Sequence, residues 1–117
     1  MVLRAAVVGL TSIGTRHALG MVGDERVVLV AGCDDGYAQN DGKTAAEVGA
    51  VFKANYAEDF PELRIYSSHT EMLAAEQLDV VTVGVSDHRH ADIVVDAANA
   101  GVRGIFCEKP LATTLEV

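Results

Sequence analysis

Three short stretches of the sequence carry residue types that can bind an anion or move a proton. The first is Gly9-Leu10-Thr11-Ser12-Ile13-Gly14, which follows an apolar run. Glycines at this spacing allow a tight turn into a helix, whose first amides favour a phosphate group. Thr11 stands where the G-x-G-x-x-G pattern has its middle glycine, and its hydroxyl and that of Ser12 can donate to phosphate instead. A plain strand-to-helix turn is the alternative interpretation.

The second stretch is the acidic pair Asp34 and Asp35, which begins 20 residues after Gly14. An acid at this spacing accepts hydrogen bonds from the ribose hydroxyls of a dinucleotide and repels a 2′-phosphate. No arginine follows directly, so the pair favours NAD over NADP. Asp34-Asp35-Gly36 is also a good turn sequence, and both roles can hold together.

The third stretch is Ser86-Asp87-His88-Arg89-His90, which follows another apolar run. Asp87 can cap the next helix, and His90 shares a helix face with Val94 and Ala97, so capping and packing are the alternatives to ligand binding. His88 and His90 diverge on a helix and do not make a metal-binding pair. We expect no metal site, and solvent or capping roles suffice for His17 and His69.

The segments that position these residues alternate in type. Short runs rich in Val and Ile, typical of strands buried on both faces, cover residues 4–10, 27–33, 80–85 and 104–107, with a weaker one at 63–66. Helical spacing covers residues 13–22, 44–55, 70–75 and 90–100, and Gly101 ends the last helix, whose apolar face holds Ile93, Val94, Ala97 and Ala98. Right-handed crossovers then predict a doubly wound parallel sheet in the order 3-2-1-4-5, with helices on both faces. The turns at residues 9–14 and 86–90 would flank its switch point, where ligands bind.

Composition excludes several other classes. Nine Lys and Arg residues against 17 Asp and Glu give a net charge of −8, so a nucleic acid or an anionic membrane would be repelled at long range. No apolar run approaches the ~18 residues of a membrane helix, and the first residues lack the features of a secretory signal. We therefore expect a cytoplasmic protein, with Cys33 and Cys107 as buried hydrophobic residues.

The second half of the chain carries a more specific pattern. His90, the run Ala97-Ala98-Asn99-Ala100-Gly101, and Glu108-Lys109-Pro110-Leu111 after a strand resemble the N-terminal domain of the glucose–fructose oxidoreductase, inositol dehydrogenase and MocA (Gfo/Idh/MocA) family. With the glycine turn and Asp34, the resemblance spans nearly the whole chain. Ser86 and Asp87 stand where Pro and Asn are usual in that family.

The resemblance implies the Rossmann domain of an oxidoreductase that moves a hydride between NAD(P) and a hydroxyl of a sugar, cyclitol or similar polyol. Lys109 would be catalytic, because the matching lysine hydrogen-bonds the substrate hydroxyl and helps to relay its proton; a surface lysine paired with Glu108 is the alternative. The cofactor-binding residues would be Gly9, Thr11, Ser12, Ile13, Gly14, Asp34, Asp35, Ser86, Asp87, His90, Glu108, Lys109 and Pro110.

Residues 1–117 are expected to form one dinucleotide-binding domain. Thr113-Thr114-Leu115-Glu116 is typical of a capped helix start, so we expect a chain cut before the domain ends, without the family's C-terminal substrate domain. The expected partners are a dinucleotide, a polyol in the longer protein, and further copies in a homo-oligomer, but no nucleic acid and no membrane. A non-catalytic module that serves as a scaffold, dimerisation unit or nucleotide sensor is the alternative.

Overall fold

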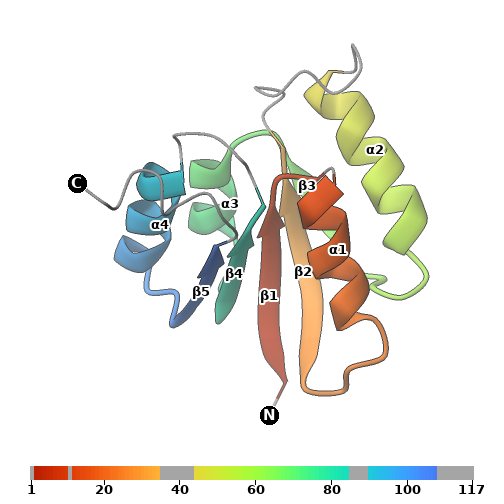
Figure 1. Ribbon diagram of the computed structural model, residues 1–117, viewed down its shortest axis with the longest axis horizontal. Helices are drawn as coiled ribbons and strands as arrows, with labels where there is room; N and C mark the ends of the chain where they lie inside the picture. The colour runs from red at the N-terminus through yellow and green to blue at the C-terminus, as the bar shows by residue number, and fades with distance from the viewer. Residues whose placement is uncertain (1, 11, 35–43, 85–89, 108–117) are drawn as a thin grey trace.

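Five parallel strands form one sheet in the order β3-β2-β1-β4-β5 (Figure 1). The computed structural model describes residues 2–10, 12–34, 44–84 and 90–107. Within them the strands are β1 (Leu3–Val8), β2 (Val27–Cys33), β3 (Arg64–Tyr66), β4 (Val80–Val83) and β5 (Gly104–Cys107). The doubly wound class and the strand order predicted from the sequence are therefore confirmed.

Four described helices cover the sheet: α1 (Ser12–Met21), α2 (Ala45–Tyr56), α3 (His69–Ala75) and α4 (His90–Asn99). Figure 1 shows α1 and α2 over the strands from β1 to β3, and α3 and α4 over the other face. Each helix begins and ends within one residue of its predicted bounds. The apolar patterns of the sequence thus located these elements well.

Side chains of the central strand β1 alternate between two cores. Ala5 and Val7 pack with α1 and α2 in one apolar cluster, while Ala6 and Val8 pack with α3 and α4 in the other. This two-residue period is the geometry of a strand buried on both faces. Burial of β1 on both sides fixes where its carboxyl end lies, and the glycine turn begins there.

Local capping explains where three helices begin or end. Thr44 and Glu47 form a capping box at the start of α2, with side chain to backbone distances of 3.2 and 2.9 Å. The Ser68 hydroxyl accepts from the Glu71 amide at the start of α3. Gly101, at φ 92°, ends α4, and the amides of Gly101 and Val102 close the last turn on the carbonyls of Ala98 and Ala97.

Two side-chain expectations were wrong. Ala98 is exposed, because the face of α4 that packs on the sheet is centred on Ile93 and Ala97. Solvent contact or capping alone does not describe His69: its Nε2 lies 2.8 Å from a carboxylate oxygen of Asp96, which joins α3 to α4. Cys33 is buried as predicted, whereas the side chain of Cys107 lies outside the description.

Candidate dinucleotide site

The candidate site lies at the carboxyl edge of the sheet, the upper edge in Figure 1. Gly9, Asp34 and Gly84 directly follow β1, β2 and β4. The last residues of these strands are paired in register, Val8 with Cys33 on one side and with Val83 on the other. The three strand ends are therefore neighbours at the centre of the edge, as the sequence predicted.

Gly9 makes the turn that leads from β1 toward α1. Its φ of 92° lies in the left-handed region, which residues with a Cβ rarely adopt, so this position requires glycine. Its amide donates to the Cys33 carbonyl at 2.7 Å, which ties the turn to the end of β2. α1 begins at Ser12, so free amides at a helix N-terminus follow this turn.

Asp34 lies against that turn. Its side chain is buried, with 9% of the residue exposed. One carboxylate oxygen, Oδ2, accepts from the Leu10 amide at 3.1 Å, and the Asp34 amide donates to the Tyr66 carbonyl at 3.2 Å. The acid thus connects the glycine turn, β2 and β3 in one place.

The sequence did not predict the bond between Asp34 and Leu10. The two residues are 24 positions apart, and no short-range pattern relates them. Only the prediction that β1 and β2 are neighbouring parallel strands could have brought their carboxyl ends together. That prediction said nothing about which backbone amide the acid would meet.

The structure describes only some of the residues of the predicted site. The backbones of Ser12, Ile13 and Gly14 begin α1, and that of His90 begins α4. Thr11, Asp35, Ser86, Asp87, Glu108, Lys109 and Pro110 lie outside the described residues. Their proposed roles stay predictions.

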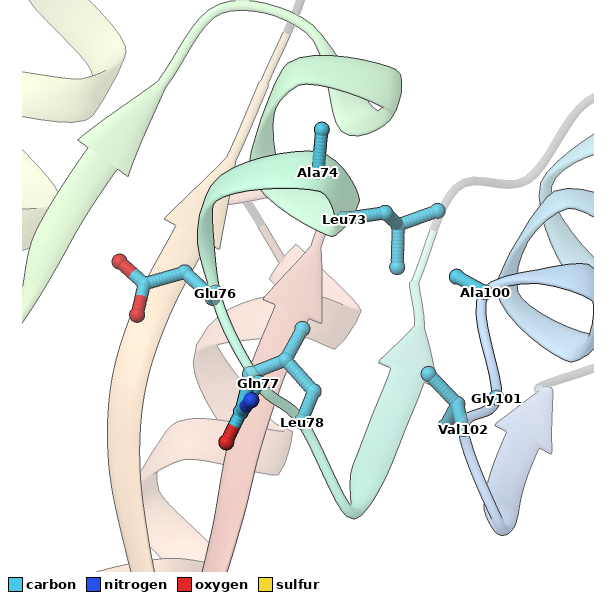
Figure 2. A pocket seen from close by; sticks show the side chains of 8 residues that line it. All are labelled: Leu73, Ala74, Glu76, Gln77, Leu78, Ala100, Gly101 and Val102. Carbon is cyan, nitrogen blue, oxygen red and sulfur yellow. The ribbon is translucent and has the colours of Figure 1, made fainter.

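A pocket of about 350 Å³ lies at the opposite edge of the sheet. Figure 2 shows it between the C-terminal ends of α3 and α4, with Leu73 pointing toward Ala100 and the Glu76 carboxylate turned away. Its position after the helices, rather than after the strands, separates it from Gly9 and Asp34. The pocket is therefore not part of the candidate site.

None of the described helices is long and apolar enough to cross a membrane. Among the described side chains, no three of His, Cys, Asp or Glu come close enough together to hold a metal ion.

Sequence comparison finds one family across the chain. A model of the Gfo/Idh/MocA oxidoreductases, described as an oxidoreductase family with an NAD-binding Rossmann fold, matches residues 3–117. Inositol 2-dehydrogenase of Salmonella typhimurium is 30% identical over 115 residues, which cover 97% of this chain and 30% of that enzyme. Inositol 2-dehydrogenase 2 of Paenarthrobacter aurescens is 30% identical over 98% of this chain and again 30% of the enzyme.

Solved structures agree. Myo-inositol dehydrogenase from Lactobacillus casei, in complex with NAD(H) and myo-inositol, matches 99% of this chain and 31% of its own, with a TM-score of 0.72 and 26% identity. The WlbA dehydrogenase from Bordetella pertussis, in complex with NADH and UDP-GlcNAcA, matches 98% of this chain and 30% of its own, with a TM-score of 0.76 and 26% identity. The chain thus spans less than a third of these relatives, and the comparisons give no support to a non-catalytic scaffold or sensor.

Proposed function

This chain belongs to the Gfo/Idh/MocA oxidoreductase family as its NAD-binding Rossmann domain, and we propose that it serves an enzyme acting on a polyol. The reaction would move a hydride between NAD and a hydroxyl of a sugar, cyclitol or similar compound. Inositol 2-dehydrogenases among the relatives support this substrate class. Homo-oligomerisation and a cytoplasmic location stay predictions.

The observation that carries the proposal is the turn between β1 and α1. Gly9 at φ 92° directs the chain into a helix whose first amides have no partner within the helix. Such a helix start is suited to a pyrophosphate, because amides and helix dipole both favour an anion. We propose that Gly9, Thr11, Ser12, Ile13 and Gly14 hold the pyrophosphate.

Asp34 supports the choice of NAD. Its carboxylate lies at the end of β2, beside the same turn, where a ribose hydroxyl can donate to it. A 2′-phosphate would bring like charges together there, and Asp35 adds to that repulsion. We propose that Asp34 and Asp35 make the site prefer NAD over NADP.

The remaining residues are assigned from the family resemblance. Ser86, Asp87, His90, Glu108 and Pro110 would contact the cofactor or hold its loops, and the cofactor when bound supplies the hydride acceptor. Lys109 would hydrogen-bond the substrate hydroxyl, favour the alkoxide over the alcohol, and help to carry its proton away.

We also propose that these residues are half of an active site. The relatives are more than three times as long as the matched region, which covers 30% of each. A second domain would orient the polyol and shield it from water, and the cofactor domain alone would therefore turn over slowly.

Calorimetric titration with NADH and NADPH tests the cofactor role. We expect NADH to bind more tightly than NADPH. We expect Gly9→Ala to weaken NADH binding about tenfold, because the free variant leaves the left-handed conformation, which costs Ala about 1–2 kcal/mol, and must regain it on binding. Gly101→Ala is the matched control, since Gly101 has the same φ of 92° but lies at the end of α4, away from the site. A folded chain that binds neither nucleotide, or equal losses in the two variants, would overturn the proposal.

A further inference from the structure

We propose that Asp34 is a positioning residue that holds the glycine turn in its binding conformation before a dinucleotide arrives. This role is separate from recognition of the ribose, although it rests on the proposed function for its consequence. The basis is the bond from the Leu10 amide to Asp34 Oδ2, at 3.1 Å and in a buried place.

The turn is attached to β2 through two consecutive amides. Gly9 donates to the Cys33 carbonyl at 2.7 Å, and Leu10 donates to the next residue, Asp34. The first bond continues the pairing of β1 with β2, but the second depends on a side chain. Because the acceptor is a carboxylate in a buried place, this bond is stronger than a bond between neutral groups.

Packing of its side chain also holds Leu10 in place. It is buried in the cluster under α1 and α2, and a Cβ added to Gly32 would lie 3.0 Å from Leu10 Cδ2. Leu10 is therefore held by packing on β2 and by the carboxylate that follows β2. Loss of Asp34 would release the backbone of Leu10 while its side chain stays packed.

The Asp34 amide extends this attachment to β3, because it donates to the Tyr66 carbonyl at 3.2 Å. The carboxylate that holds the turn is thus itself fixed by strand pairing. Replacement of Asp34 would then affect every ligand of the turn, whether or not that ligand has a ribose.

Two roles of Asp34 predict opposite effects on a ligand without ribose. If Asp34 only reads the ribose, Asp34→Ala removes a negative charge beside an anion site and strengthens pyrophosphate binding. If Asp34 positions the turn, the same change weakens pyrophosphate binding despite the lost repulsion. An Asp34 replacement made to admit a 2′-phosphate would then weaken the binding of NADH without improving the binding of NADPH.

Amide hydrogen exchange measured by NMR tests the positioning role without any ligand. In Asp34→Ala we expect the Leu10 amide to exchange at least about tenfold faster than in the unchanged chain, with the Val7 amide as internal reference. Asp34→Asn keeps an oxygen acceptor, so we expect a smaller acceleration, between those of the unchanged chain and Asp34→Ala. Glu58→Gln, at an exposed position, is the matched control for removal of one charge.

Titration with inorganic pyrophosphate, NADH and NADPH completes the test. We expect Asp34→Ala to weaken all three by at least about threefold, and Glu58→Gln to leave them unchanged. Unchanged exchange at Leu10 in both Asp34 variants, or tighter pyrophosphate binding in Asp34→Ala, would overturn the inference. Faster exchange at Leu10 in a chain that binds no nucleotide would support the positioning role and refute the proposed function instead.

Discussion

Two glycines within helices differ in how much space surrounds them. Gly49 lies in α2, where an added Cβ would come 2.5 Å from Cγ2 of Ile65 in β3. Gly20 lies in α1, and a Cβ there would meet nothing within 4 Å. The close approach of α2 to β3 therefore depends on Gly49, while Gly20 only lowers the helix propensity of α1.

Alanine at these two positions should have opposite effects on stability. Gly49→Ala forces α2 away from β3, and we expect the free energy of unfolding to fall by about 1–3 kcal/mol. Gly20→Ala restricts the unfolded chain and suits the helix, so we expect a rise of about 0.5–1 kcal/mol. Urea unfolding of both variants measures this, and a change of the same sign in both would contradict it.

At the scale of elements, one carboxylate joins α3 to two strands. The Glu76 side chain, 5% exposed, directly follows α3. Its Oε1 accepts from Arg4 of β1 at 3.0 Å, and its Oε2 accepts from the Tyr66 hydroxyl of β3 at 2.6 Å. α3 has only seven residues, with Met72 as its buried side chain, so this attachment adds to what holds it in position.

The hydrogen bond to Glu76 raises the pKa of Tyr66 above its usual 10.0, with burial adding to the effect. A raised pKa means that the folded protein favours the neutral phenol. The stability due to this bond is therefore present below about pH 10 and is lost as the pH rises through the raised pKa.

Tyr66→Phe should accordingly cost stability only below that range. We expect its free energy of unfolding to be lower by roughly 1.5–3 kcal/mol at neutral pH, as for a hydrogen bond to a charged group. The difference from the unchanged chain should shrink above about pH 10. Urea unfolding over this range is the measurement. Tyr56→Phe is the comparison at neutral pH, because the Tyr56 hydroxyl donates to an uncharged carbonyl, that of Thr15, and its loss should cost less, about 0.5–1.5 kcal/mol. A difference that stays constant with pH would contradict the assignment.

Elements were predictable because each carries its own signal, and contacts between elements were not. Val-rich runs, helical spacing of apolar residues and Gly101 indicated the strands and helices from neighbouring residues alone. His69 with Asp96, and Leu10 with Asp34, join residues 27 and 24 positions apart through side-chain geometry. That Gly9 and Asp34 lie at neighbouring strand ends followed from the motif and the predicted strand order, whereas the hydrogen bond between Leu10 and Asp34 is visible only in the structure.

At the scale of the whole molecule, the two edges of the sheet differ. β3 packs against α2 through Gly49 and Ile65. β5, at the other edge, carries Phe106, which is 63% exposed although its neighbour Ile105 packs in the core under α3 and α4. Phe106 and Ile105 point to opposite faces, and on the side of Phe106 no described helix covers β5 in Figure 1.

Phe52 and Phe106 allow the stability cost of losing a buried ring to be compared with that of losing an exposed one. Phe52 of α2 is 2% exposed, and we expect Phe52→Ala to lower the free energy of unfolding by about 3–5 kcal/mol. Phe106→Ala should change it by less than about 0.5 kcal/mol, because the ring already contacts solvent. Urea unfolding of the two variants decides, and a large loss in Phe106→Ala would mean that this ring is covered in solution.

Of the five described strands, β1 leaves the ribosome before the others and becomes the middle strand of the finished sheet. One of its edges can pair once β2 is made, but the other waits for β4, and the Arg4 amide finds its partner Asp79 only 75 residues later. Synthesis proceeds at roughly 5–20 residues per second, so the stretch from β2 to β4 takes on the order of several seconds. Throughout that interval the nascent chain presents an unpaired apolar strand edge, which makes translation the time when this domain is most exposed to aggregation.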